Sequence, residues 1–190
     1  MKVVLASASP RRQELLKLLF DEFEVRPSNA DETPPSDIKC EDVPLFLAKV
    51  KAESVGSYCE KDTLVIGCDT SVIVDGEILG KPHGRDDAYR MLKLLSGKEH
   101  KVITGCCALM NGETLCFSEE TKVTFYELSE KDINDYISTG EPFDKAGAYG
   151  IQGYGALLTQ KIDGDFFNVV GLPVSRLNRE IRGLTGEKQV

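Results

Sequence analysis

The apolar positions of this 190-residue chain switch between strand-like runs and helical spacing from its first residues onward. An apolar run at residues 3–6 ends in small hydroxyl residues, and a leucine stripe at helical spacing follows it. This pattern predicts a buried strand, a tight loop and a helix. Ser9 is placed to cap that helix, and Pro10 falls at its first position, where the missing N–H costs nothing.

The same periodicities divide the remaining chain. Helical spacing predicts further helices at residues 44–58, 86–95 and 173–183, and one after the capping box formed by Ser129 and Asp132. Apolar or alternating runs predict strands at residues 22–26, 64–67, 71–74, 77–79, 101–110 and 113–126. Turns at residues 75–76 and 111–112 join strands as hairpins, and another turn at residues 163–164 separates residues 156–162 from residues 166–170.

Strands and helices are therefore mixed, and several strand pairs are antiparallel. We expect an α/β protein with an elongated mixed β-sheet flanked by helices, not a plain alternating array. Hydrophobic residues make up 41% of the chain and charged residues 28%, which is typical of one globular domain across residues 1–190.

Net charge and hydropathy exclude several partners. The formal net charge of −8 argues against a surface that coats nucleic acid. No apolar run reaches the length of a membrane span, and the first apolar run meets a polar residue too early for a signal peptide. We therefore expect a cytoplasmic protein that binds neither nucleic acid nor membrane.

The numbers of cysteines and histidines bear on metal binding and on redox state. The six cysteines form no C-x-x-C pair, and two histidines are too few for a typical zinc site. Reduced thiols are the expectation for a chain without an export signal. Cys106 and Cys107 are neighbours in a strand-like run, which points their side chains to opposite faces. Both His83 and His100 are expected at the surface.

Charged and hydroxyl side chains gather where strands are predicted to end. Residues 7–12 lie at a helix N-terminus, where backbone amides and the helix dipole attract anions. Asp69 and Thr70 also follow an apolar run, and ligands of open α/β sheets lie beyond strand carboxyl ends. Besides Asp69 and Thr70, the candidate site residues are Ser7, Arg11 and Arg12 from residues 7–12, and Glu32, Lys51, Lys81 and Gln152 from the rest of the chain.

Each candidate also has a plainer interpretation. The two arginines could be solvated residues of a first helical turn, Asp69 a turn former, and Glu32 an ordinary loop acid. Lys51 could extend from its helix into solvent. Residue types and spacing alone thus predict a phosphate-binding α/β domain and no specific reaction.

A set of ordered motifs resembles the Maf family of nucleoside triphosphate pyrophosphatases over nearly the whole chain. The motifs are Leu5-Ala6-Ser7-x-Ser9-Pro10-Arg11-Arg12, Asp31-Glu32, Leu47-Ala48-x-x-Lys51-Ala52, Gly67-x-Asp69-Thr70, Gly80-Lys81-Pro82, Leu95-Ser96-Gly97, the run from Asp144 to Gly153, and Gly171-Leu172-Pro173. The resemblance implies a fold similar to the inosine triphosphatase-like enzymes, with two lobes and a central cleft. It also implies hydrolysis of a nucleoside triphosphate to the monophosphate and pyrophosphate, with Mg²⁺ or Mn²⁺, and a homodimer.

The resemblance also assigns roles to the candidate residues. Glu32 and Asp69 are the implied metal ligands, with Asp69 the critical catalytic residue. Phosphate binding falls to Ser7, Arg12, Lys51 and Lys81. Arg11, Thr70 and Gln152 resemble the base-selecting set of the dTTP/UTP subgroup. The amide of Gln152 offers a donor and acceptors, which suit the edge of uracil or thymine.

Several alternatives stay open at this point. Asp69 either accepts a proton from the attacking water or orients a water that the metal holds. Modified pyrimidine nucleotides fit the same residues as ordinary ones. A nucleotide-binding regulator of septum formation and cell division, with little catalysis, is the main competing function, and an anion-binding interaction scaffold is another.

Overall fold

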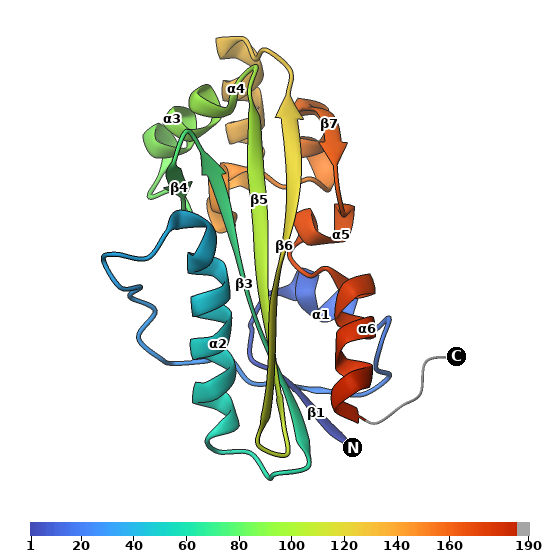
Figure 1. The fold of residues 1–190 in the computed structure, drawn as a ribbon. Helices are drawn as coiled ribbons and strands as arrows, with labels where there is room; N and C mark the ends of the chain where they lie inside the picture. The colour runs from blue at the N-terminus through green and yellow to red at the C-terminus, as the bar shows by residue number, and fades with distance from the viewer. Residues whose placement is uncertain (186–190) are drawn as a thin grey trace. The chain divides into compact units, whose positions relative to one another are not determined.

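The computed structural model describes residues 1–185 and divides them into two compact units (Figure 1). The first unit contains residues 1–69, residues 104–119 and the C-terminal part from residue 171. The second contains residues 70–103 and 120–170. The single domain expected over residues 1–190 stays a prediction, and residues 186–190 lie outside the described part.

A seven-stranded sheet contributes strands to both units, in the order β2-β1-β3-β5-β6-β7 with β4 beside β3. β1 (Lys2–Leu5) pairs in parallel with β2 (Glu24–Val25) and with β3 (Thr63–Val74). β3 pairs antiparallel with β4 (Glu77–Leu79), as does β6 (Glu113–Phe125) with β7 (Thr159–Asp163). β5 (Glu99–Met110) completes the sheet. The predicted mixed sheet is confirmed.

The hairpin signals act as expected. Both residues of the turn between β5 and β6, Asn111 and Gly112, have positive φ angles of 54° and 83°. Asp75 and Gly76, between β3 and β4, have φ angles of 51° and 81°. Two successive positive φ angles are the geometry that matches the twist of a two-residue hairpin, and Asn-Gly and Asp-Gly accept it readily.

Helices complete each unit. The first unit has α1 (Pro10–Leu16), α2 (Val43–Gly56), α6 (Val174–Thr185) and the 3-10 turn η1 (Cys40–Asp42). The second has α3 (Arg85–Leu95), α4 (Glu130–Ser138), α5 (Phe166–Val170) and the 3-10 turns η2 (Glu141–Asp144), η3 (Ala146–Ala148) and η4 (Gly153–Leu158). The predicted capping box at the start of α4 is present, with Ser129 and Asp132 each accepting from the other's backbone. None of the helices within residues 1–185 combines the length and apolarity that a membrane span requires.

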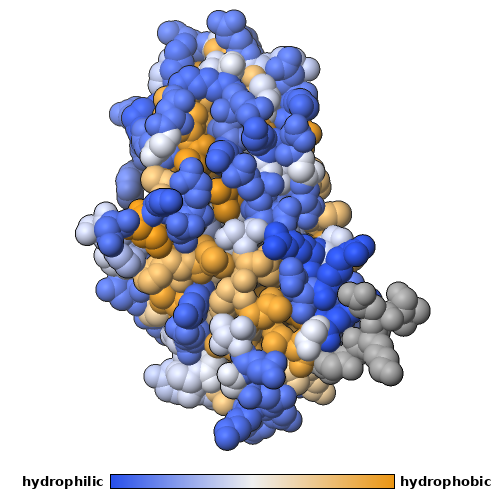
Figure 2. All heavy atoms as spheres, in the orientation of Figure 1, coloured by the Kyte–Doolittle hydropathy of each residue, from blue (hydrophilic) through white to orange (hydrophobic). Residues whose placement is uncertain are grey.

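The sheet of the first unit is covered on both faces. Val4, Ala6, Val65 and Val55 form an apolar cluster that joins β1 and β3 to α2. On the other face, the Arg176 guanidinium of α6 lies 4.6 Å from the ring centre of Phe117 on β6. On the face drawn in Figure 2, hydrophobic residues gather over the strands of this unit.

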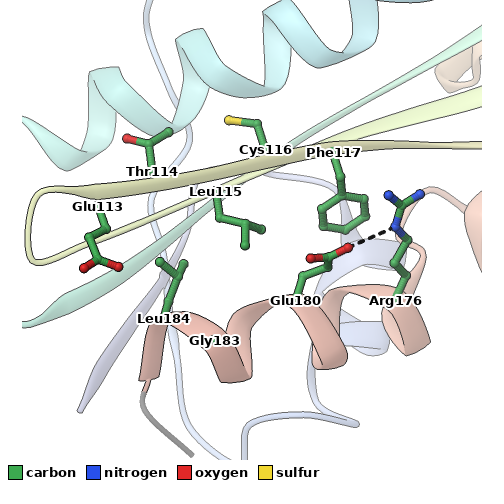
Figure 3. A pocket seen from close by; sticks show the side chains of 9 residues that line it. All are labelled: Glu113, Thr114, Leu115, Cys116, Phe117, Arg176, Glu180, Gly183 and Leu184. Carbon is green, nitrogen blue, oxygen red and sulfur yellow. Dashed lines mark hydrogen bonds and ion pairs between the residues drawn. The ribbon is translucent and has the colours of Figure 1, made fainter.

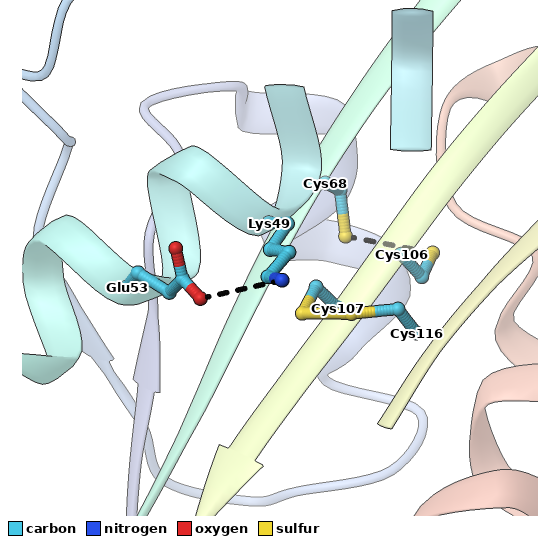
Figure 4. Close-up of a disulfide and its surroundings, with 6 residues drawn as sticks. All are labelled: Lys49, Glu53, Cys68, Cys106, Cys107 and Cys116. Atoms are coloured by element: carbon cyan, nitrogen blue, oxygen red, sulfur yellow. Dashed lines mark hydrogen bonds and ion pairs between the residues drawn. A yellow bond between two sulfur atoms is a disulfide. The ribbon is translucent and has the colours of Figure 1, made fainter. Parts of the chain in front are cut away.

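The cysteines correct one expectation. Cys107 is bonded to Cys116 across the β5–β6 hairpin, so the prediction that all the cysteines are free thiols is wrong (Figure 4). The two positions are equidistant from the turn at residues 111–112 and therefore stand opposite each other, with Cα atoms 4.2 Å apart. Cys106 points the other way, and its sulfur lies 3.7 Å from that of Cys68. The opposite orientation of Cys106 and Cys107 is confirmed.

His100 corrects another expectation, because it is only 2% exposed. Its ring stacks edge-on against Phe125 and Tyr149 in the core of the second unit, with centroids 5.0 and 5.4 Å away. Its Nε2 hydrogen-bonds the Tyr149 hydroxyl at 2.8 Å, whereas Nδ1 has no partner in the described structure. Burial lowers the pKa of His100 to about 4, because the apolar surroundings disfavour the charged ring.

This buried imidazole predicts a loss of stability in mild acid. The unfolded chain protonates His100 near pH 6.5 and the folded chain only near pH 4, so the free energy of unfolding falls as pH drops through that window. For His100→Gln, the decrease in unfolding free energy between pH 7 and pH 4 should be smaller than in the wild type by about 3 kcal/mol. Urea unfolding at both pH values measures this. His83→Gln, at an exposed histidine, should keep the wild-type pH dependence; an equal pH dependence in all three proteins would contradict the account.

Candidate active site

Two candidate segments of the first unit belong to neighbouring parallel strands: Ser7 follows the carboxyl end of β1, whereas Asp69 lies within β3, which continues to Val74. Leu5 of β1 is in register with Ile66 of β3, and the Ala6 N–H donates to the Ile66 carbonyl at 2.8 Å. Ser7 then follows β1 at about the level where β3 reaches Cys68 and Asp69. The two segments therefore belong to adjacent strands. The expectation that Asp69 and Thr70 follow the end of a strand is wrong, because the strands predicted at residues 64–67 and 71–74 form the single strand β3, which continues through both residues.

Arg12 binds three parts of the chain together at this edge. Its Nε donates to the Gly171 carbonyl at 2.8 Å, and its Nη1 donates to the Cys68 carbonyl at 2.9 Å and the Ser7 hydroxyl at 3.1 Å. Ser7 is buried, and its Oγ also accepts from the Ser9 N–H at 3.3 Å. Arg12 is therefore fixed by protein oxygens, one of them the backbone carbonyl of the residue before Asp69.

Its position depends on local helix geometry. The Arg12 N–H donates to the Ser9 hydroxyl at 3.5 Å, so the predicted cap of α1 is present, and Pro10 stands at the start of the helix. Gly171 is a partner that the sequence analysis did not identify as functional. The Gly171-Leu172-Pro173 motif was the available signal, but spacing alone could not indicate that its carbonyl reaches Arg12.

The Lys51 ammonium lies between the two predicted metal ligands. Its Nζ is 2.6 Å from Asp69 Oδ1 and 3.0 Å from Glu32 Oε2. The side chains of Lys51 and Asp69 are only 12% and 16% exposed, whereas that of Glu32 is 45% exposed. Two carboxylates thus converge on one cationic group from the loop before α2 and from β3, and together they exceed its charge by one.

Two glycines allow α2 to lie close enough for this contact. A Cβ atom on Gly67 of β3 would come within 2.3 Å of the Ala48 carbonyl oxygen and 2.7 Å of the Ala52 nitrogen. A Cβ atom on Gly105 of β5 would lie 2.4 Å from the Pro44 carbonyl. The backbone of α2 therefore packs directly on the sheet. Gly67 and Asp69 alternate along β3 onto the same face, so Lys51 on α2 meets Asp69.

The donor set fits a divalent cation that the substrate helps to hold. Glu32 and Asp69 supply carboxylate oxygens, the ligand type that Mg²⁺ and Mn²⁺ prefer, and both already point at one positive charge. Within residues 1–185, no group of three or more histidine, cysteine or acidic side chains is arranged to hold a metal. In nucleotide enzymes, Mg²⁺ is usually bound by one or two protein carboxylates together with phosphate oxygens of the substrate.

The remaining candidates are placed as follows. Arg11 is half-buried beside Arg12 on α1, and Thr70 is half-buried and follows Asp69 on β3. Lys81 and Gln152 belong to the second unit, and both are exposed. There the Gly147 N–H donates to the Gly80 carbonyl at 3.0 Å, which joins the segment before Lys81 to the glycine-rich stretch that carries Gln152.

A separate hollow of about 700 Å³ lies in the first unit between β6 and α6 (Figure 3). Leu115, Phe117 and Leu184 form part of its wall, and Arg176 pairs there with Glu180 at 3.3 Å. None of the predicted site residues lines it.

Known relatives match this chain almost end to end. The family model described as Maf-like protein matches residues 2–184. A protein of Carboxydothermus hydrogenoformans named dTTP/UTP pyrophosphatase is 50% identical over 96% of this chain and 98% of its own. Proteins of the same name from Thermosipho africanus and Bacillus cereus are 52% and 47% identical, over 93% and 95% of this chain and 90% and 94% of theirs.

Solved structures match less completely. The Staphylococcus aureus Ham1 protein aligns with a TM-score of 0.49 at 16% identity, covering 66% of this chain and 72% of that one. The two-lobed arrangement with a central cleft stays a prediction. The mixed sheet and the side chains beside β3 define an α/β protein in which two carboxylates converge on one lysine. The chain belongs to the Maf-like protein family, as its motifs indicated.

Two glycine-to-alanine changes should shift the free energy of unfolding in opposite directions, because α2 packs against Gly67 whereas Gly183 faces open space. Gly67→Ala should lower the unfolding free energy by about 2–3 kcal/mol, because its methyl group overlaps the backbone of α2. Gly183→Ala in α6 meets no atom within 4 Å and should raise it by up to about 1 kcal/mol through helix propensity. Urea unfolding measures both values. A Gly67→Ala protein as stable as the wild type would contradict the packing described.

Proposed function

We propose that this protein hydrolyses dTTP and UTP to the nucleoside monophosphate and pyrophosphate with the help of Mg²⁺ or Mn²⁺. The observation that carries the proposal is the convergence of Glu32 and Asp69 on the Lys51 ammonium, on the strand whose Cys68 carbonyl binds Arg12. Relatives about half identical over almost their full length bear the name of this activity, which supports the assignment of the substrate.

The triphosphate would be bound by positive and hydroxyl groups. Arg12 is already oriented by the Gly171 and Cys68 carbonyls, so little order has to be gained when a phosphate approaches its charge. Ser7, Lys51 and Lys81 are the other proposed phosphate ligands. Neutralising a triphosphate is the main electrostatic requirement of phosphoryl transfer, and lysine and arginine meet it.

Glu32 and Asp69 would hold the divalent cation. Lys51 occupies the space between them, so its ammonium would have to shift toward the phosphates for the two carboxylates to hold the cation. When bound, such a cation neutralises charge on the phosphate oxygens. The partial exposure of Glu32 leaves a route by which the ion and the triphosphate can enter together.

Asp69 is the proposed catalytic residue. The oxygen of a water molecule forms a bond to the α-phosphorus, and the bond from that phosphorus to the oxygen bridging to the β-phosphorus breaks. Pyrophosphate leaves with the electron pair of that bond. The Asp69 carboxylate either accepts the proton of the water or orients the water by accepting its hydrogen bond, in which case the proton passes to the solvent.

Base selection is proposed for Arg11, Thr70 and Gln152. Uracil and thymine present two carbonyl oxygens and one N–H, and the exposed Gln152 amide can both donate to and accept from such an edge. A site that tolerates the 5-methyl group accepts both bases, and modified pyrimidine nucleotides remain candidates. The homodimer and the cytoplasmic location also stay predictions.

Asp69→Asn should reduce pyrophosphate release from dTTP and UTP by about 10³-fold, because the amide can neither accept a proton nor supply a carboxylate for the cation. The variant should stay folded, since Lys51 keeps Glu32 as an ion-pair partner. A coupled pyrophosphate assay with Mg²⁺ and with Mn²⁺ measures the rates, and a thermal melt checks folding.

Asp75→Asn is the matched control for this experiment. Asp75 is exposed in the β3–β4 turn, and asparagine accepts its positive φ angle, so the rate should equal that of the wild type. Asp69→Asn turnover within threefold of the wild type would refute the assignment of Asp69. A wild-type protein that binds dTTP but releases no pyrophosphate with either metal would instead be the nucleotide-binding regulator.

A further inference from the structure

The glycine-rich stretch that carries Gln152 is held by one carboxylate, that of Glu141. Glu141 opens η2, directly after Gly140, which has a φ of 77° and ends the preceding helical region. Its Oε2 accepts from the Tyr154 N–H at 2.9 Å, and its Oε1 accepts from the Gly155 N–H at 3.2 Å. Two successive backbone amides on the C-terminal side of Gln152 therefore bind a single side chain.

The N-terminal side of Gln152 is fixed by the same network. The Tyr136 hydroxyl donates to Glu141 Oε1 at 2.9 Å and accepts from the Gly150 N–H at 3.0 Å. Tyr136 is 4% exposed, and burial raises its pKa, so the hydroxyl keeps its proton and remains a donor to the carboxylate. The segment from Gly150 to Gly155 is thus fixed at both ends, and Gln152 stands exposed between them.

The glycines of this segment are required where these side chains approach the backbone. A Cβ atom at Gly153, whose φ is 70°, would lie 2.7 Å from Glu141 Oε2. One at Gly155 would lie 2.9 Å from the Tyr136 hydroxyl oxygen and 2.1 Å from the Gly150 carbonyl oxygen. Their positions follow from contact with Glu141 and Tyr136, which gives a physical reason for a glycine spacing that fits no dinucleotide-binding fingerprint.

We infer that Glu141 is a positioning residue for base selection, acting on the nucleotide through the backbone that presents Gln152. This inference rests on the proposed function, because it assumes that Gln152 reads the pyrimidine. Glu141 itself touches no substrate. Its carboxylate sets the path of residues 150–155 and hence the direction in which the Gln152 amide is offered.

Glu141→Gln tests the inference, because glutamine replaces one carboxylate oxygen with an NH₂ group. At least one N–H or O–H group that donated to the carboxylate then faces another donor and loses its hydrogen bond. The KM for dTTP and UTP should rise at least fivefold, with kcat changed less than threefold. The ratio of kcat/KM for dTTP to that for GTP should fall about tenfold. Inhibition by inorganic tripolyphosphate, which has no base, should keep its wild-type inhibition constant.

Two further variants make the comparison specific. Tyr136→Phe removes the hydroxyl that links Gly150 to Glu141 but keeps the ring, and it should shift the dTTP:GTP ratio in the same direction. Glu127→Gln is the control, because Glu127 is an exposed glutamate of the same unit outside this network, and its kinetics should match the wild type. A parallel rise in the tripolyphosphate inhibition constant of Glu141→Gln would overturn the inference.

Hydrogen–deuterium exchange separates this inference from the proposed function. Glu141→Gln should speed amide exchange at Tyr154 and Gly155 at least tenfold relative to the wild type, whether or not dTTP is hydrolysed. Unchanged exchange in this segment would overturn the positioning role even in an active enzyme. If exchange is faster in Glu141→Gln but the wild type hydrolyses neither dTTP nor UTP, the positioning role stands and the proposed function is wrong.

Discussion

The contact between α2 and the sheet is the constraint on which the candidate site depends. Gly67 and Gly105 have no side chains, so the backbone of α2 lies against β3 and β5. At this distance Lys51 reaches Asp69 at 2.6 Å instead of extending into solvent. A larger residue at Gly67 would move α2 outward and separate the ammonium from the carboxylate. A backbone packing feature thereby determines the electrostatics of the site.

The same geometry explains why two acidic side chains can be held close together. Glu32 and Asp69 would repel each other without a positive charge between them, and the Lys51 ammonium supplies that charge. Because the pair exceeds the ammonium by one negative charge, the site still attracts a cation. In the proposed reaction the arriving nucleotide carries four or so negative charges at neutral pH, which gives Lys51 a second set of partners. Lysine and metal then share the neutralisation of carboxylates and phosphates.

Sequence patterns predicted the features that depend on neighbouring residues. The Ser9 cap, the hairpin turns and the capping box at Ser129 all follow from side chains within a few positions of one another. The bond from Arg12 to Gly171 could not be predicted in this way, because 159 positions separate the two residues. The family resemblance assigned the candidate residues to one site. It did not indicate that the Lys51 ammonium lies between the carboxylates of Glu32 and Asp69.

The errors have equally specific causes. The expectation that His100 lies at the surface is wrong because its strand position turns the ring toward those of Phe125 and Tyr149. The Cys107–Cys116 pair was available from the sequence, since both residues are equidistant from the Asn111-Gly112 turn. Glu141 was not among the predicted site residues, because two of its partners are backbone amides that no residue pattern reveals.

Manganese binding in the absence of nucleotide tests the central claim most directly, namely that Lys51 occupies the cation position between Glu32 and Asp69. Removing its charge with Lys51→Met should increase the affinity for Mn²⁺ at least tenfold, measured by electron paramagnetic resonance of free Mn²⁺ during titration. Adding Asp69→Asn to that variant should abolish the gain. If Lys51→Met binds Mn²⁺ no more tightly than the wild type, the two carboxylates are not the cation site and the account is contradicted.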